Sequence, residues 1–256
     1  MTTAKTGLFI DLSNVTETVP DEADLSHASG FVITEPALPE GLLPGDGILT
    51  FLDVSPRETS ELLPDGAPAI HVCPHGLEET ARQREKYPEV TWFPRTDVHR
   101  LKTGYYFPAS HYDEGFRTYR PIIPEGGAYR CADGDTPLTE WLKRAKEMGF
   151  TQVWLHAPEA ERAGRGLDLD MLELARAAWP GGLWLSGGAT TPEHLRNLVR
   201  EGGAEGVVVP LAMALAHGCD ALVAALRVAP SAGERGPATL VTTSRGKPSR
   251  DNPQAG

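Results

Sequence analysis

The chain has 256 residues, of which 40% are hydrophobic and 23% are charged, and its formal net charge is −11. This size suits a single barrel-sized domain, and the negative charge argues against nucleic-acid binding because phosphates would repel it. No apolar run approaches the roughly 20 residues of a membrane helix, and the polar residues 1–5 do not form a signal peptide. Three widely spaced cysteines indicate a reducing compartment, so we expect a cytoplasmic protein.

Eight short apolar runs along the chain predict β-strands. Such nearly continuous apolar runs are typical of parallel strands that are buried on both faces. The predicted strands are residues 7–11, 30–34, 47–54, 68–73, 89–93, 151–156, 182–186 and 205–209.

Helical patterns separate most of these strands, and the later connections carry the longer ones. The predicted helices are residues 136–148, 168–178, 191–201 and 212–226, with another at 76–86 and a short one at 56–63. Alternating strands and helices indicate an α/β fold with a parallel sheet. Eight strands in a chain of this length favour a closed (βα)8 TIM barrel over a doubly wound sheet.

Two segments are additional to the strands and helices of a minimal TIM barrel. Residues 95–135 hold five of the six tyrosines, and we interpret them as an insertion with its own hairpin after strand 5. Such a long segment is either a lid over the site or a structural cap. Residues 229–256 are rich in Gly, Pro, Ser and Thr and predict a disordered tail, which leaves residues 1–228 as a single barrel domain.

The segment after the seventh predicted strand carries the clearest functional signal. Ser186, Gly187 and Gly188 join that strand to a helix whose first turn contains Pro192. Glycines at a strand–helix junction let backbone N–H groups approach an anion, and barrels bind phosphate at the loops after strands 7 and 8. These three residues are therefore the predicted phosphate site, although glycines there also serve tight packing.

Polar residues at predicted strand ends are the other candidates, because that end of a barrel strand faces the active site. Asp11 is a candidate acid/base or an N-cap, and Asp53 is a candidate acid/base or a helix cap. His156 titrates near neutral pH and suits proton transfer, unless it is a hydrogen-bonded core residue. Arg95 is placed to bind an anionic group of the substrate or to face solvent.

The alternating triplet His71, Cys73 and His75 has the spacing of metal ligands on one face of a strand. Pro74 disturbs that geometry, and the sequence offers no fourth ligand. We therefore predict no metal and no cofactor.

The C-terminal half resembles a known family. TEWLKRAKEMGFTQVWLHAPEAERAGRGLDLDMLELARAAW, together with SGGATTPEHL and EGGAEGVVV, is similar to the histidine-biosynthesis barrels. The similarity is greatest to the cyclase subunit of imidazole glycerol phosphate synthase, and next to phosphoribosylformimino-AICAR ribotide isomerase. The resemblance implies a TIM barrel, a general acid/base at Asp11, and substrate-positioning residues at His156 and Glu161.

The chain also departs from this family. No residue matches the family's second catalytic Asp, since the nearest acid after the fifth predicted strand is Asp97. Glycines are missing after strands 3 and 4, and Pro210 stands where backbone N–H groups should meet phosphate. These departures argue against a bisphosphate substrate and leave open a ligand with one phosphate or none.

Two functions follow from the sequence. The favoured one is an enzyme that acts on a phosphorylated small molecule, such as a sugar phosphate or ribotide, by isomerase or lyase chemistry, with acid/base catalysis by Asp11 and by His156 or Glu161. The alternative is a catalytically inactive barrel that binds a metabolite or a protein partner. A homo-oligomer or a partner protein is compatible with both. The two functions differ in whether Asp11, Asp53, His156 and Glu161 meet in one pocket beside Gly187.

Overall fold

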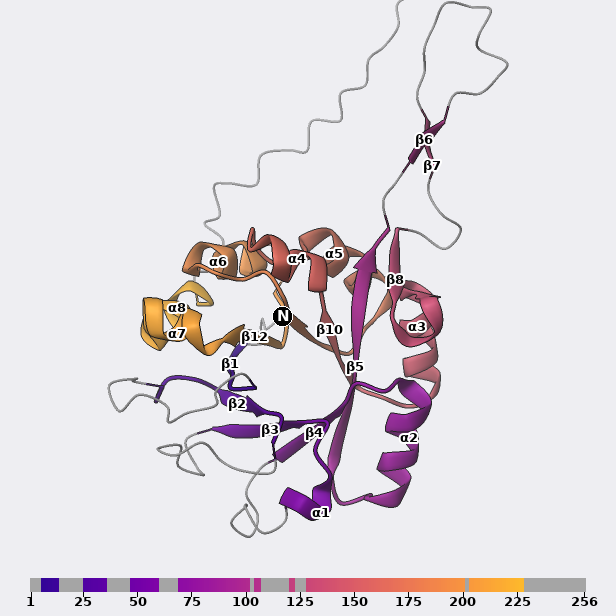
Figure 1. The fold of residues 1–256 in the computed structure, drawn as a ribbon, viewed down its shortest axis with the longest axis horizontal. Coiled ribbons are helices and arrows are strands. Elements are labelled where there is room, and N and C mark those ends of the chain that lie inside the picture. Colours follow the sequence, from indigo (N-terminus) through magenta and orange to yellow (C-terminus); the bar gives the residue numbers. More distant parts are fainter. Residues whose placement is uncertain are drawn as a thin grey trace, which may run out of the picture.

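The computed structural model describes residues 6–13, 25–35, 47–59, 69–101, 104–106, 120–122, 128–200 and 203–227. Its centre is a closed ring of eight parallel strands with helices outside (Figure 1). In chain order the ring strands are β1 (Gly7–Asp11), β2 (Gly30–Ile33), β3 (Ile48–Leu52), β4 (Ala69–Cys73), β5 (Thr91–Arg100), β10 (Gln152–His156), β11 (Gly182–Ser186) and β12 (Gly206–Pro210). All eight predicted strands, and the predicted TIM barrel, are confirmed.

Two parallel pairings close the ring. β1 pairs with β12, so that Gly7 lies opposite Gly206, and β5 pairs with β10, so that Asp97 lies opposite His156. Each ring strand therefore has a partner on both edges, and its backbone polar groups are satisfied while both of its faces are buried.

The helices match the predicted positions with some changes of boundary. They are α1 (Pro56–Thr59), α2 (Leu77–Lys86), α3 (Leu138–Glu147), α4 (Pro158–Ala163), α5 (Leu169–Ala178), α6 (Pro192–Arg200), α7 (Leu211–His217) and α8 (Cys219–Ala225). The single helix predicted at 212–226 is two helices, because Gly218 takes a φ of +76° and ends α7. α4 has no counterpart among the predicted helices; it begins at Pro158 and ends at Ala163, before the left-handed Gly164. None of the helices among the described residues is long and apolar enough to span a membrane.

The predicted boundaries of strand 5 and of the insertion need correction. β5 does not end at Phe93 but continues to Arg100, because it pairs with β10 and then with the antiparallel β8 (Tyr129–Cys131). The insertion therefore leaves the barrel after Arg100 and not at Arg95. Residues 136–137, predicted as helix, pair with β8 as β9 (Thr136–Pro137).

A hairpin of β6 (Gly104–Tyr106) and β7 (Arg120–Ile122) lies within the insertion, as predicted. Figure 1 draws it beyond the ends of β5 and β8. Residues 107–119 and the predicted tail at 229–256 lie outside the described residues. The lid role and the division at residue 228 remain predictions.

The core has two parts. The inside of the barrel, which we call the lumen, is filled by side chains that point inward from the ring strands: Phe9, Val32, Ile70, Val72, Phe93, Trp154, Trp184 and Val208. Trp184 lies at the centre of this group, with its ring 3.9 Å from that of Phe9 and 5.4 Å from that of Phe93. The larger part lies between the strands and the helices and includes Leu142, Leu172 and Leu195, which are fully buried. The packed lumen closes the barrel below the site described next.

Candidate functional site

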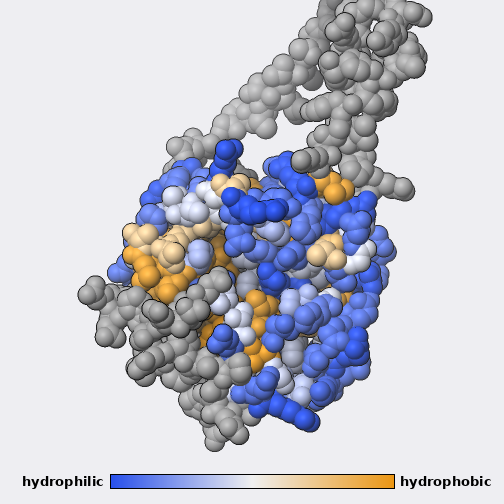
Figure 2. Space-filling view, in the orientation of Figure 1, coloured by the Kyte–Doolittle hydropathy of each residue, from blue (hydrophilic) through white to orange (hydrophobic). Residues whose placement is uncertain are grey.

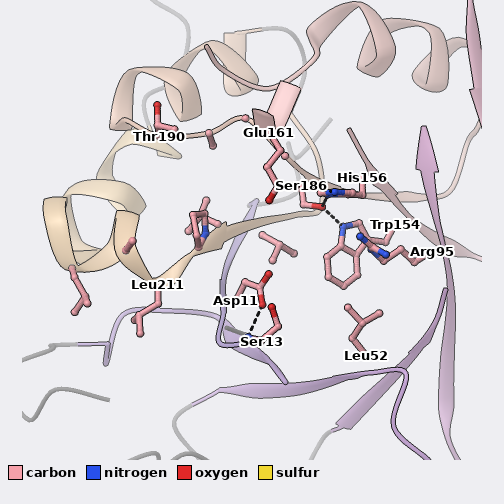
Figure 3. Close-up of a pocket in the computed structure, with 18 residues that line it drawn as sticks. Asp11, Ser13, Leu52, Arg95, Trp154, His156, Glu161, Ser186, Thr190 and Leu211 are labelled. Atoms are coloured by element: carbon pink, nitrogen blue, oxygen red, sulfur yellow. Dashed lines mark hydrogen bonds and ion pairs between the residues drawn. The ribbon is translucent and has the colours of Figure 1, made fainter. Parts of the chain in front are cut away.

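A cavity of about 640 Å³ opens at the carboxyl end of the barrel strands. Figure 3 shows Arg95, Trp154, His156 and Ser186 on one side of it and Leu211 on the opposite side, with Asp11 between them. The wall of the cavity also includes Glu161 from α4, the segment from Gly187 to Thr190, and the start of α7. This is the end of a TIM barrel where active sites lie.

The two-residue period of a β-strand explains how the polar groups reach this cavity. A residue two positions beyond an inward-pointing side chain points inward again, one layer higher. Four strands place an aromatic residue in the lumen and a polar residue above it, facing the cavity. The four pairs are Phe9–Asp11, Phe93–Arg95, Trp154–His156 and Trp184–Ser186.

His156 is the most enclosed titratable group of the site, with 12% of its side chain exposed. Its Nδ1 lies 2.9 Å from the Ser186 hydroxyl oxygen, and its Nε2 lies 3.2 Å from a carboxylate oxygen of Glu161. Burial, and then the positive charge of Arg95, hold the pKa of His156 below 6.5, although nearby carboxylates oppose this. A histidine with a lowered pKa is neutral at pH 7 and can accept or donate a proton.

Arg95 lies in the wall of the cavity with 18% of its side chain exposed. One of its terminal nitrogens is 3.2 Å from Asp97, and its guanidinium lies 5.3 Å from the Trp154 ring centre. The cation–π contact and the ion pair hold the guanidinium in place. Of the two predictions for Arg95, the one in which its side chain faces solvent is therefore wrong.

The position of Asp11 confirms its capping contact and leaves its acid/base role as a prediction. Its carboxylate accepts a hydrogen bond from the Ser13 backbone N–H at 2.9 Å, as a cap of the following turn does. It also lines the cavity. A carboxylate held in this way keeps a fixed orientation beside a ligand.

The glycines after β11 are required by packing. Gly187 and Gly188 both have a φ of +96°, which disfavours any other residue. A Cβ atom on Gly187 would lie 2.5 Å from the Ala157 carbonyl oxygen, and one on Gly188 would lie 2.1 Å from that of Gly166.

The same loop nevertheless has backbone N–H groups beside the cavity that lack a backbone partner among the described residues. Within the described part of the chain, the backbone N–H groups of Gly187, Gly188 and Ala189 donate no hydrogen bond to another backbone group. The Ser186 hydroxyl, by contrast, already contacts Trp154 and His156. An anion at this loop would therefore meet backbone N–H groups.

Pro210 does not prevent the start of α7 from contributing backbone N–H groups to such an anion site. It precedes α7, so its missing N–H lies outside the helix, and the next N–H groups belong to Leu211 and Ala212 in the first turn. Leu211 and Ala212 line the cavity. A short extra helix after strand 8 is the usual phosphate-binding element of TIM barrels.

Asp53 is not part of this site. Its carboxylate lies 2.7 Å from Nε2 of His75, and both residues line a separate cavity of about 530 Å³ beside α2. The four predicted acid/base residues therefore do not all meet: Asp11, His156 and Glu161 share one cavity with Gly187, and Asp53 lies elsewhere.

The predicted absence of a metal site at the histidine–cysteine triplet is compatible with the geometry. His71 is buried, with Nδ1 3.1 Å from the Val54 carbonyl oxygen, and burial lowers its pKa. His75 is paired with Asp53 instead. Among the described residues, no group of three or more His, Cys, Asp or Glu side chains could hold a metal ion.

Two contributors to the site were recognised only in part from the sequence: Trp154 and helix α7. Trp154 was interpreted as barrel packing, yet it also lines the cavity and its indole N–H donates to Ser186 at 2.7 Å. Its position two residues before His156 on one strand was the signal for this. The start of α7 at Leu211 lies one residue before the predicted helix at 212–226, and only its end at Gly218 was not recognised.

No family model matches the chain. It is similar to the imidazole glycerol phosphate synthase subunit HisF of Corynebacterium glutamicum (strain R), with 32% identity over 91 residues, 31% of this chain and 35% of that protein. The HisF subunit of Paenarthrobacter aurescens (strain TC1) is 34% identical over 90 residues, 35% of this chain and 33% of that protein. The chain thus spans about a third of the length of the curated relatives it matches.

The eight-stranded parallel ring and this similarity agree with each other. The chain is a divergent barrel, similar to the histidine-biosynthesis family. One solved structure, that of the 4-hydroxy-2-oxoglutarate aldolase/2-deydro-3-deoxyphosphogluconate aldolase from TTHB1, matches with a TM-score of 0.45 and 18% identity over 88% of this chain and 92% of that one. The similarity of this divergent barrel to HisF covers only part of the chain, so it indicates the fold more firmly than the reaction.

Proposed function

We propose that this divergent barrel is an enzyme that acts on a phosphorylated small molecule by acid–base chemistry of the isomerase or lyase type. The observation that carries the proposal is one cavity that holds Asp11, His156 and Glu161 beside the free N–H groups of the Gly187 loop. Proton-transferring groups and anion donors are thereby brought to the same ligand.

The phosphate group of the substrate would bind at the loop after β11 and at the first turn of α7. Both elements bring backbone N–H groups to the cavity wall, and α7 adds the positive end of a helix. The HisF relatives belong to an enzyme named after a phosphorylated compound, imidazole glycerol phosphate. A substrate with one phosphate fits the single cluster of donors.

The proton transfer would involve Asp11 and His156. In an isomerisation, the Asp11 carboxylate takes a proton from the hydroxyl-bearing carbon beside a carbonyl group and returns it to the former carbonyl carbon, while the hydroxyl proton passes to the former carbonyl oxygen. His156 lines the same cavity to one side of Asp11, where its imidazole can hydrogen-bond the carbonyl oxygen (Figure 3). Arg95 would bind an anionic part of the substrate or the negative charge that develops on that oxygen.

Ligand binding tests the phosphate part of the proposal. We would measure the melting temperature of the protein with inorganic phosphate, ribose 5-phosphate, triose phosphates, ribotides and, as a control, unphosphorylated ribose. A ligand that binds only the folded state raises that temperature. We expect a rise with one or more of the phosphorylated compounds and none with ribose.

A matched pair of variants locates the binding site. Ala212 is exposed in the first turn of α7 and lines the cavity. Ala212→Glu adds a carboxylate that the helix N-terminus tolerates but that repels phosphate, whereas Ala212→Gln adds the same bulk without charge. We expect the thermal shift to disappear in the first variant and to persist in the second.

Hydrogen exchange tests the chemistry. With a ligand that binds, incubation in D2O should place deuterium on the carbon next to the carbonyl, and Asp11→Asn should stop this exchange while binding persists. If a folded protein binds no phosphorylated compound, the proposal is wrong, and the alternative of a catalytically inactive binding barrel takes its place.

A further inference from the structure

The hydroxyl group of Ser186 lies between two ring nitrogens. The indole Nε1 of Trp154 is 2.7 Å from Ser186 Oγ, and Nδ1 of His156 is 2.9 Å from the same atom. An indole N–H can only donate a hydrogen bond, so the Ser186 oxygen accepts from Trp154. Ser186 is 7% exposed and therefore has little access to water.

This arrangement determines the direction of the second hydrogen bond. If His156 donated from Nδ1, the Ser186 hydroxyl hydrogen would have no acceptor within the described part of the chain. A buried donor without an acceptor is costly. The Ser186 hydroxyl therefore donates to Nδ1, and the proton of the neutral imidazole lies on Nε2.

The surroundings of Nε2 lead to the same assignment. A carboxylate oxygen of Glu161 lies 3.2 Å from Nε2, and an ionised carboxylate can only accept. The charged groups that act on the ring are Arg95 and Asp97 from β5, Asp11 from β1 and Glu161 from α4. The lowered pKa of His156 means that a neutral ring, with one proton to place, is the relevant form near pH 7.

We propose that Ser186 is a positioning residue that holds His156 as the Nε2–H tautomer, so that the site presents a hydrogen-bond donor to a carbonyl oxygen of the ligand. The inference rests on the proposed function and narrows its substrate class to phosphorylated aldehydes and ketones. It also changes the role of the Ser186 side chain, which serves His156 and leaves phosphate to the backbone N–H groups of the loop.

The position of Glu161 is compatible with this role. Its side chain is 62% exposed, so it has room to move away when a carbonyl oxygen takes its place at Nε2. When the carbonyl oxygen replaces the Glu161 carboxylate as the acceptor at Nε2, the hydrogen bonds from Trp154 to Ser186 and from Ser186 to His156 stay unchanged.

Nitrogen NMR of the ligand-free protein with 15N-labelled histidine tests the tautomer directly. The spectrum would be recorded at pH 8, and His156→Gln would identify the His156 signals among those of the eight histidines. We expect a protonated Nε2 and an unprotonated Nδ1. A ring protonated at Nδ1 would overturn the proposal without any further variant.

Two variants test the part played by Ser186. In Ser186→Ala the donor to Nδ1 is lost, and we expect the ratio of the two tautomers to fall by about fivefold to tenfold, which corresponds to one hydrogen bond. Ser186→Thr keeps the hydroxyl and should keep the tautomer. A His156 spectrum that is identical in wild type and Ser186→Ala would show that Ser186 does not position the ring.

Dissociation constants distinguish a failure of this inference from a failure of the proposed function. Dihydroxyacetone phosphate and glycerol 3-phosphate differ in a carbonyl at one carbon, so the ratio of their dissociation constants measures the value of that group. We expect the wild type to prefer the ketone and Ser186→Ala to lose most of the preference. Equal affinities in the wild type would refute the carbonyl contact. Failure to bind any of the phosphorylated compounds of the thermal-shift test would refute the proposed function, while the NMR result still decides the tautomer.

Discussion

The substitution Gly188→Ala would measure how strongly packing constrains the loop at the candidate site. The added Cβ would lie 2.1 Å from the carbonyl oxygen of Gly166, 2.9 Å from its carbonyl carbon and 3.0 Å from that of Ala160. These are backbone atoms, and the Gly166 N–H donates to the Gly188 carbonyl oxygen at 2.9 Å, so the contact cannot be relieved by a side-chain rotation.

The expected loss has two components. The left-handed backbone at a φ of +96° costs an alanine about 1–2 kcal/mol, and crowding against fixed atoms costs about 1–3 kcal/mol. We expect the free energy of unfolding to fall by about 2–5 kcal/mol, a large part of the stability of a typical domain.

Gly149 provides the matched control. Its φ is +77°, and a Cβ there would meet nothing within 4 Å, so Gly149→Ala measures the backbone component alone. Urea unfolding of both variants, followed by tryptophan fluorescence, gives the two free energies. If Gly188→Ala is no less stable than Gly149→Ala, the packing explanation of Gly188 is wrong.

Three further predictions follow from buried groups. Trp184→Ala removes the central ring of the lumen and should lower the free energy of unfolding by about 3–5 kcal/mol in urea titrations, whereas a loss below 1 kcal/mol would contradict the packed lumen. Burial lowers the pKa values of His156 and His71 in the folded state. The unfolded chain therefore binds more protons than the folded protein just below pH 6.5, so the free energy of unfolding should decline as pH falls through that value. The decline should be smaller in His156→Gln. A free energy of unfolding that is the same at pH 8 and pH 5.5 would contradict this prediction. Burial raises the pKa of Cys131 to about 12, and Cys219 is also buried, so these two thiols of the native protein at pH 8 should react with thiol reagents only as fast as the protein unfolds.

The sequence was sufficient to predict the barrel because each strand follows a simple local pattern. The runs at residues 183–185 and 207–209 are apolar throughout and each follows a glycine, and both lie in ring strands. β5 was predicted too short because five of the six residues 95–100 are polar. They remain extended because β10 and β8 pair with them, and such long-range pairing has no local signal.

The candidate site was predicted in part for the same reason. The positions of Asp11, His156 and Gly187 at one end of the ring follow from strand direction alone. The separation of Asp53 from them depends on its turn, where φ is +62° and the carboxylate meets His75. The hydrogen bond from Trp154 to Ser186 joins residues 32 positions apart and becomes visible only when the register of β10 and β11 is known.

Figure 2 shows hydrophobic residues gathered over α7 and α8, beside the centre of the barrel. Leu215 of α7 is 47% exposed, the one large hydrophobic side chain of the described residues that is classed as exposed, and it lines the cavity. The cavity is therefore polar on the side of His156 and apolar on the side of Leu215, and a ligand that fills it needs a carbon surface as well as polar groups.

The pairing of β1 with β12 joins the two ends of the barrel and has a consequence for folding. Asp11 lies opposite Pro210, so the cavity draws on segments about 200 residues apart in the chain. Such a contact carries a large loop-closure entropy and forms slowly. A partly folded chain would lack some of the polar groups that line the cavity. A ligand that contacts both Asp11 and α7 would therefore stabilise the closed ring. By mass action, such a ligand would raise the stability of the closed ring in proportion to the logarithm of its concentration once the site is nearly saturated.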